Sequence, residues 1–103
     1  MPITSKQRAQ LRGMAMEADT IVHVGKGGVT DAVIESVNTA LTARELVKGR
    51  VLENSMLTAR EACDALCEAC GAEPVQVIGT RFVLFRRNHA APKIELVKDK
   101  KKK

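Results

Sequence analysis

The sequence predicts an α/β fold in which three helices alternate with four strands, in the order helix, strand, helix, strand, helix, strand, strand. Three observations lead to this order. Two capping boxes, Thr4 with Gln7 and Thr58 with Glu61, each stand before a helical pattern of apolar residues. Short runs rich in valine and isoleucine lie between the helical patterns, as expected of strands. A Gly-Thr pair at positions 79 and 80 separates the last two runs and fits a two-residue hairpin turn.

The first half of the chain is predicted to hold two helices and one strand. A helix runs from the Thr4 cap to about Met16, and three cations lie off its apolar stripe, namely Lys6, Arg8 and Arg12. A strand over residues 21–24 ends at a glycine loop, and Thr30 caps a second helix that continues to about Ala43. Both helices therefore begin at residues whose side chains can accept hydrogen bonds from the first turn.

Three strands are predicted in the second half of the chain. In the first of them, residues 46–52, positions 47, 49 and 51 should face the core, which leaves Lys48 and Arg50 on the opposite face. The last two, residues 75–78 and 82–87, form the hairpin around the Gly-Thr turn. The first of these strands therefore has one apolar side and one cationic side.

The third helix, from Thr58 to Cys70 with Gly71 after its last turn, carries all three cysteines of the chain. Their spacing, C-x3-C-x2-C, is also that of the cluster-binding motif in radical enzymes that use S-adenosylmethionine. That motif needs a loop around an iron–sulfur cluster, whereas a capped helix places Cys63 and Cys70 on a core stripe. We therefore predict core packing for the cysteines, with Cys67 nearest the edge, and no metal or other cofactor.

Length and charge predict one domain over residues 1–92 of the 103, followed by a basic, disordered tail over residues 93–103. The net charge is +5, and the tail alone contributes +4 through six lysines and two acidic residues. The N-terminal stretch and the last strand are basic, whereas the third helix is acidic, so one side of the domain should suit a polyanion. The absence of a long apolar stretch and of a signal-peptide pattern predicts a cytoplasmic protein with no membrane partner.

The loop at residues 25–28, Gly-Lys-Gly-Gly, is the strongest functional signal. Glycines allow another chain to approach the backbone, and free N–H groups at a helix N-terminus favour anions. Lys26 adds a mobile positive charge. The six-residue G-x-G-x-x-G frame and the G-K-[ST] ending of nucleotide-binding loops are both absent, so no mononucleotide site is expected. The loop is then either a site for a nucleic-acid phosphate or simply a tight turn.

Three segments carry a resemblance to a known family. They read V-G-K-G-G-V-T at residues 24–30, E-L-V-K-G-R-V at residues 45–51 and V-Q-V-I-G-T-R-F-V-L-F-R-R at residues 75–87. Their order and spacing resembles the CRM domain (chloroplast RNA splicing and ribosome maturation) in its stand-alone, YhbY-like bacterial form. The resemblance implies a two-layer fold with a four-stranded mixed sheet, similar to the C-terminal domain of a bacterial translation initiation factor. Gly49 departs from the family, whose second strand normally has a branched apolar residue at this position.

The resemblance also implies RNA binding in assembly of the large ribosomal subunit, with ribosomal RNA or its precursor particle as partner. The RNA-contacting loop would fall on Gly25, Lys26, Gly27 and Gly28. Seven further cations are candidates for flanking phosphate contacts: Lys6, Arg8, Arg12, Lys48, Arg50, Arg86 and Arg87. The only two aromatic side chains, Phe82 and Phe85, are predicted on opposite sides of the sheet, which favours phosphate contact over base stacking.

No catalytic arrangement is found, and His23 is interpreted as a packed or sheet-surface residue rather than a base. We therefore expect no enzyme and no small-molecule substrate. Two alternatives stay open at the level of sequence. The first is a general RNA chaperone with no ribosomal preference. The second, from another class, is a redox or iron–sulfur protein built on the three cysteines.

Overall fold

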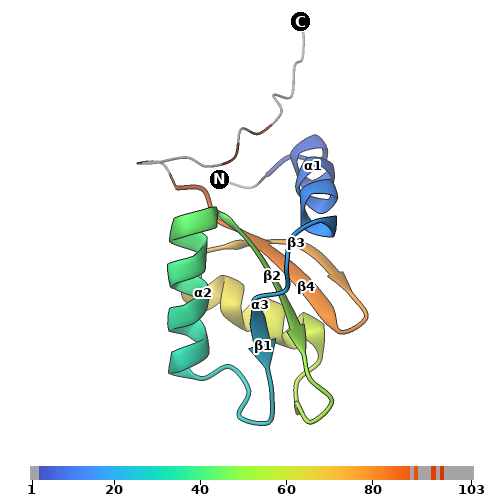
Figure 1. The fold of residues 1–103 in the computed structure, drawn as a ribbon, viewed down its shortest axis with the longest axis vertical. Helices are drawn as coiled ribbons and strands as arrows, with labels where there is room; N and C mark the ends of the chain where they lie inside the picture. The colour runs from blue at the N-terminus through green and yellow to red at the C-terminus, as the bar shows by residue number, and fades with distance from the viewer. Residues whose placement is uncertain (1–2, 89, 91–93, 95, 97–103) are drawn as a thin grey trace, which may run out of the picture.

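The computed structural model of the protein describes residues 3–88, 90, 94 and 96. Three helices and four strands follow one another in the predicted order (Figure 1). The largest differences from the predicted bounds occur at the hairpin, where β3 starts earlier and β4 ends earlier than expected. Within the described residues, none of the helices is both long and apolar enough to cross a membrane. The elements are α1 Ser5–Met16, β1 Val22–Val24, α2 Asp31–Arg44, β2 Leu46–Val51, α3 Ala59–Cys70, β3 Glu73–Ile78 and β4 Arg81–Phe85.

The four strands form one mixed sheet in the order β1-β2-β4-β3. β1 runs parallel to β2, whereas β4 is antiparallel to both of its neighbours, β2 and β3. Helices α2 and α3 pack on one face of the sheet, and α1 packs on the other face near one end (Figure 1). The predicted class, three helices with a four-stranded mixed sheet, is therefore confirmed.

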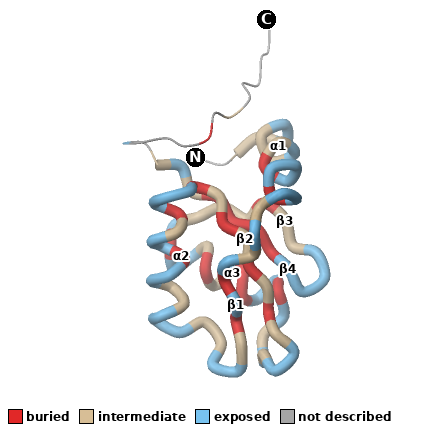
Figure 2. Tube along the Cα trace, in the orientation of Figure 1, coloured by how far each residue is buried: buried red, intermediate tan, exposed pale blue. Residues whose placement is uncertain are grey.

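Each face of the sheet has its own core. The larger core packs α2 and α3 against the sheet and includes Leu41, Leu66 and Phe82. The smaller core packs Leu11 and Ala15 of α1 against β2, β3 and β4. Buried residues follow the strands and the inward sides of the helices, whereas the outer side of α2 and the loops are exposed (Figure 2). Because α1 is short and stands at one end, part of its face of the sheet has no helix over it.

Strand β2 alternates as predicted: positions 47, 49 and 51 are buried, whereas Lys48 and Arg50 are partly buried on the opposite face. The structure explains the glycine in this strand. A Cβ at Gly49 would lie 2.6 Å from Cζ of Phe82 and 3.2 Å from Cβ of Val22. The phenyl ring therefore fills the space that a branched side chain on β2 would occupy.

The predicted helix caps are all present. Thr4 and Thr58 each form both hydrogen bonds of a capping box, and Thr30 accepts a bond from the first turn of α2 at 3.3 Å. Gly71 has a φ of +66° after the last turn of α3, which favours glycine. The first hairpin strand was predicted to begin at residue 75, whereas β3 begins at Glu73 and therefore includes Pro74. An edge strand with a bulge at this point accommodates a residue that has no N–H to donate.

The cysteines pack as predicted. Cys63 and Cys70 are buried in the larger core, and Cys67 is half-buried beside it. The thiol of Cys70 donates a hydrogen bond to the carbonyl of Ile34 at 3.7 Å, and burial raises the pKa of this thiol. A hydrogen bond with Cys63, and then burial, raises the pKa of the Cys67 thiol. In the part of the chain that the structure describes, no group of three or more His, Cys, Asp or Glu residues is placed to hold a metal ion.

Glu45 connects the end of α2 to the segment after β4. This residue has a φ of +67° and is fully buried. Its carboxylate accepts hydrogen bonds from the backbone N–H groups of Asn88 at 2.6 Å and Ile94 at 2.7 Å. Ile94, which lies beyond the domain boundary predicted at residue 92, is buried in the smaller core. The rest of the predicted tail, residues 93, 95 and 97–103, lies outside the described residues.

Candidate nucleic-acid interface

The glycine loop connects β1 to α2 at the end of the sheet opposite α1 (Figure 1). The N–H of Gly28 donates to the carbonyl of Gly25 at 3.0 Å, which closes a tight turn. Gly28 has a φ of +74°, whereas Gly25 and Gly27 have ordinary φ angles. A Cβ at Gly25 would lie 3.5 Å from atoms of Leu52 and Asn54, so the loop lies against the segment between β2 and α3. Gly28 is therefore the glycine that this turn needs for its backbone conformation.

The tip of the loop is open to solvent. Lys26 and Gly27 are both exposed, and the Thr30 cap follows at the start of α2. The N–H groups of a first helical turn carry a partial positive charge, and the lysine adds a full one. Backbone donors and a cation at a helix N-terminus favour a phosphate or another anion. The structure thus gives the predicted loop the exposure and the charge that a phosphate contact requires.

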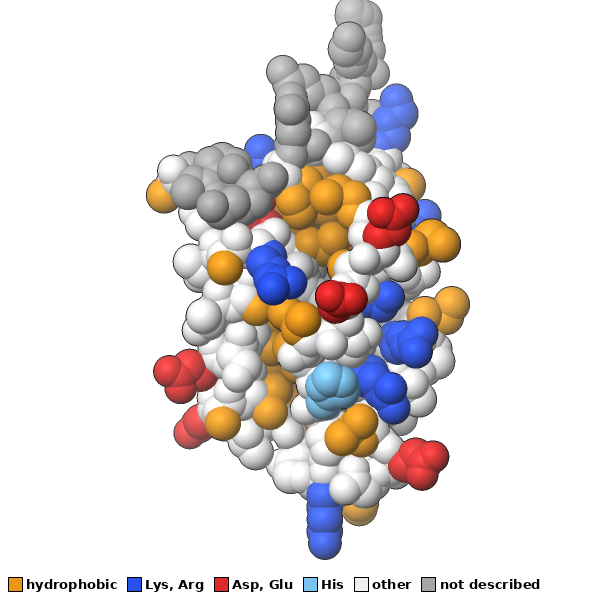
Figure 3. Space-filling view, in the orientation of Figure 1, with side chains coloured by type: hydrophobic (Ala, Val, Ile, Leu, Met, Phe, Trp, Pro, Cys, Tyr) orange, Lys and Arg blue, Asp and Glu red, His pale blue; other side chains and the backbone are white. Residues whose placement is uncertain are grey.

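A second group of residues lies beside the loop, on the face of the sheet opposite α2 and α3. Strand pairing places His23 beside Arg50, Arg50 beside Arg81, and Arg81 beside Ile78. These four residues, one from each strand, form a cross-strand row. His23, Arg81 and Ile78 are exposed, and Arg50 is half-buried. Figure 3 shows several Lys and Arg side chains gathered next to the pale-blue histidine.

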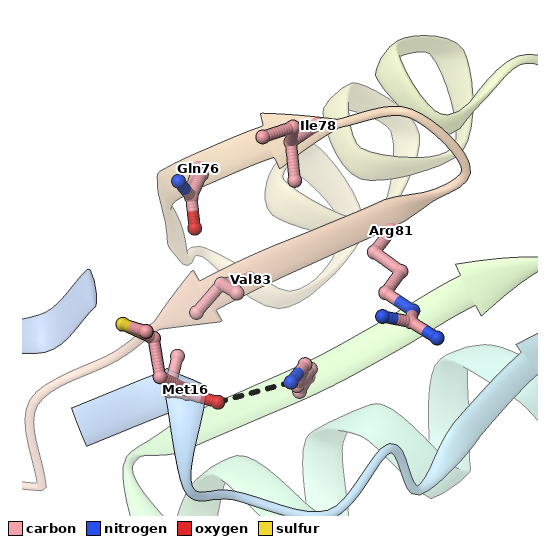
Figure 4. A pocket seen from close by; sticks show the side chains of 7 residues that line it. Met16, Gln76, Ile78, Arg81 and Val83 are labelled. Carbon is pink, nitrogen blue, oxygen red and sulfur yellow. Dashed lines mark hydrogen bonds between the residues drawn. The ribbon is translucent and has the colours of Figure 1, made fainter. Parts of the chain in front are cut away.

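The row borders a hollow of about 280 Å³ at the end of α1. Its walls come from α1, β2, β3 and β4, and Figure 4 shows Ile78 and Arg81 on one side and Met16 on the other. Met16 and Ile78 are large apolar side chains that are 81% and 63% exposed. The hollow therefore has apolar walls next to a guanidinium group.

The two cations of β2 differ in what they contact. The Nζ of Lys48 donates to the carbonyl of Ala15 at 3.1 Å, shown as the dashed line in Figure 4. This bond holds the last turn of α1 against the sheet, where a cation suits the helix C-terminus. Arg50 has no hydrogen-bond partner for its buried Nε in the described structure. Lys48 thus positions α1, whereas no described residue accepts a hydrogen bond from Arg50.

Arg86 lies away from the loop and from the row. Its guanidinium donates to the side chain and carbonyl of Asn38, to Oγ1 of Thr42 at 2.9 Å, and to the carbonyl of Cys70 at 2.8 Å. These bonds join α2 to the C-terminal end of α3. The side chain predicted as a phosphate contact is therefore occupied within the protein, while its neighbour Arg87 is exposed.

The cations of α1 stand at the other end of the sheet from the glycine loop. Lys6 and Arg12 are exposed, and Arg8 is half-buried with its guanidinium on the carbonyl of Pro74 at 3.3 Å. Of the predicted contacts, the structure thus brings Arg50 close to the loop and leaves the α1 cations apart from it. Sequence reasoning missed Arg81 and the place of His23 beside Arg50. The hairpin register could have put Arg81 on the cationic face, but its neighbour depends on the strand order.

Comparison with known proteins decides the family. A family model described as the CRS1 / YhbY (CRM) domain matches residues 3–86, most of the chain. The chain belongs to the CRM family. This CRM protein is 38% identical over 94 residues to YqeI of Bacillus subtilis, which is named a probable RNA-binding protein. The aligned residues cover 91% of this chain and 98% of YqeI. The resemblance inferred from the three segments is therefore confirmed.

Two further relatives agree. An RNA-binding protein of Haemophilus influenzae is 32% identical over 94 residues, covering 91% of this chain and 94% of its own. The solution structure of a hypothetical protein of Staphylococcus aureus matches the fold with a TM-score of 0.77 at 38% identity. That match covers 93% of this chain and all of the other. The CRM fold thus extends over nearly the whole length of both proteins.

Proposed function

We propose that this CRM protein binds structured RNA through its glycine loop and assists assembly of the large ribosomal subunit. The observation that carries the proposal is the exposed Gly-Lys-Gly-Gly turn at the N-terminus of α2, with Lys26 at its tip. RNA as the ligand is supported by relatives that are named as RNA-binding proteins. The ribosomal role rests on the family to which the chain belongs.

The mode of binding follows from what the loop offers. Its tip presents backbone N–H groups and one lysine, and its other residues are glycines without side chains. Such a surface contacts phosphates and has no side chain that could distinguish one base edge from another. Recognition at the loop is therefore led by the shape of the RNA backbone. The protein acts in the cytoplasm as a binding protein, without a cofactor and without a catalysed reaction.

A test in cells separates the ribosomal role from that of a general RNA chaperone. Tagged protein is crosslinked to RNA, the bound RNA is sequenced, and its sedimentation is compared with that of ribosomal particles. We expect crosslinks concentrated in large-subunit RNA and co-sedimentation with its precursor particles, both lost when Lys26 and Gly27 are changed to Asp. Crosslinks spread over unrelated transcripts, with no particle association, would support the chaperone instead.

A further inference from the structure

The cross-strand row carries two arginines and a histidine, and it begins next to the glycine loop. His23 stands two residues before Gly25 along β1, a distance of about 7 Å at the usual rise of a strand. From there the row crosses β2, β4 and β3 over about 14 Å, three times the usual spacing between strands. A chain held at the loop can therefore continue across the row.

The charged side chains of the row have no partners among the residues that the structure describes. Arg50 and Arg81 lie directly opposite each other in the β2–β4 ladder, an arrangement that destabilises a sheet when nothing offsets it. Among the described residues neither guanidinium has a hydrogen-bond or ion-pair partner, and the Nε of Arg50 is also shielded from solvent. Figure 3 shows acidic side chains above, below and to the left of the histidine, and none between it and the cations directly beside it. An anion from outside would offset this repulsion.

The hollow next to the row adds an apolar component. Met16 and Ile78 expose most of their side chains, and Val83 forms part of the floor. Its volume of about 280 Å³ approaches that of the smallest ligand pockets in proteins, roughly 300 Å³. The hydrogen bond from Lys48 to the end of α1 holds the wall that carries Met16. Apolar walls next to an unpaired guanidinium suit a flat, partly polar ring attached to a phosphate.

We propose that the row and the hollow, together called the sheet-face site, bind a short unpaired stretch of RNA beside the structured RNA held by the glycine loop. One base lies in the hollow against Ile78 and Met16, and its neighbouring phosphates lie on Arg50 and Arg81. An unpaired strand fits, because unstacked bases can lie on histidine, arginine and apolar side chains, whereas a duplex keeps its bases stacked inside. This inference rests on the proposed function and specifies the RNA as a junction between paired and unpaired segments.

The test compares a blunt RNA hairpin with the same hairpin carrying an unpaired extension of about six nucleotides. The extension is attached at the 5′ end in one version and at the 3′ end in another. The full chain is titrated with each labelled hairpin and followed by fluorescence anisotropy at moderate salt. The unsubstituted protein should bind the extended hairpin more tightly. The double variant His23→Ala with Arg81→Gln should lose about fivefold or more on the extended hairpin and bind the blunt one as before.

Arg60→Gln is the matched control, because it removes one exposed positive charge from the first turn of α3, in the layer opposite the sheet-face site. If the double variant loses affinity for both hairpins equally, to the extent seen with Arg60→Gln, the loss comes from general charge and the sheet-face site is overturned. An unchanged affinity for the extended hairpin would also overturn it. Binding of the blunt hairpin by the Lys26→Asp/Gly27→Asp variant reports on the loop separately, so failure of the loop and failure of the sheet-face site are distinguishable.

Crosslinking gives a second readout with the unsubstituted protein. A 4-thiouridine in the extension is crosslinked by ultraviolet light, and the modified peptides are identified by mass spectrometry. We expect crosslinks at Met16 and in the hairpin between β3 and β4. Crosslinks confined to α2 and α3 would overturn the proposal.

Discussion

At the scale of single residues, Gly49 and Phe82 show how a core position can be filled from the neighbouring strand. The two lie opposite each other in the β2–β4 ladder, and the phenyl ring covers the glycine. A ring laid over a glycine restores the cross-strand contact that the glycine alone lacks. Gly49 has an ordinary φ angle, so its role is to leave space for the ring. A branched residue on β2 and this orientation of Phe82 exclude each other.

We predict that Gly49→Val lowers the free energy of unfolding by about 1–3 kcal/mol, because the new methyl groups overlap the ring. Combining it with Phe82→Leu should recover part of the loss, since the smaller side chain vacates that space. Urea unfolding followed by circular dichroism measures both. Gly13→Ala is the control: a Cβ there meets nothing within 4 Å, and alanine in a helix should add up to about 1 kcal/mol. A Gly49→Val protein as stable as the parent would contradict this packing.

At the scale of elements, the helices could be predicted closely because their signals are local. Each begins at a threonine whose hydrogen bonds involve residues only three positions away, and α3 ends at a glycine with positive φ. The alternation of β2 and the hairpin turn were predictable for the same reason. Apart from the β3–β4 hairpin, the neighbours of each strand were not predictable, because the order β1-β2-β4-β3 depends on how separate segments pack. Only the family resemblance implied a mixed sheet.

The parts of the site that sequence reasoning missed depend on those distant neighbours. Arg81 is a candidate contact because it lies beside Arg50, which is thirty-one positions earlier in the chain. Arg86 was grouped with the phosphate contacts because it lies in the basic strand predicted over residues 82–87, but its guanidinium reaches α2 and α3. The glycine loop could be predicted because all its parts are consecutive.

Arg86 allows a test of the contact between α2 and α3. Arg86→Ala removes hydrogen bonds to Asn38, Thr42 and Cys70. Because the loss of this charged donor leaves its acceptors unpaired, the free energy of unfolding should fall by about 1–3 kcal/mol. The RNA affinity of the folded variant should stay close to that of the parent. Arg87→Ala is the matched control, because Arg87 is exposed, and should change stability by no more than about 0.5 kcal/mol. A stable Arg86→Ala variant with weakened RNA binding would support Arg86 as a phosphate contact instead.

The three cysteines of α3 give a prediction about both stability and reactivity. Changing all three to Ala should lower stability through lost packing and leave the RNA affinity of the folded protein close to unchanged. Burial and the bond with Cys63 raise the pKa of the Cys67 thiol, and burial raises that of Cys70, so little of either is thiolate at pH 8. Both should therefore react with iodoacetamide more slowly in the folded than in the urea-unfolded protein. Equal rates, or a stoichiometric metal lost with function, would refute the packing role.

At the scale of the whole molecule, charge is divided between the two layers of the fold. The exposed side of α3 carries Glu61, Asp64 and Glu68, whereas the cross-strand row and the glycine loop are cationic and lie on or next to the other face of the sheet. Such a division orients the protein on a polyanion, because the acidic layer is repelled as the cationic one is attracted. The sequence predicted a polarised surface, and the fold places these three acidic residues and the cross-strand row in different layers.

The lysine-rich C-terminus should act through the same long-range attraction. Deleting residues 98–103 removes five lysines and one aspartate. We expect a similar loss of affinity for all RNAs and a flatter dependence of log Kd on log salt, with an unchanged melting temperature. Titrations at several salt concentrations, together with thermal melts, measure this. A loss restricted to one RNA would mean that the tail makes a specific contact.

The most direct test of the central claim is the RNA affinity of the Lys26→Asp/Gly27→Asp variant. Gly27 has an ordinary φ, and a Cβ there lies at a normal 3.5 Å from Thr30, so the loop should accept both side chains while Gly28 keeps the turn. Two carboxylates would then face the phosphate and one lysine would be gone. Affinity for structured RNA should fall by about tenfold or more at moderate salt, with an unchanged far-ultraviolet circular dichroism spectrum. Parental affinity in a folded variant would remove the glycine loop from the interface.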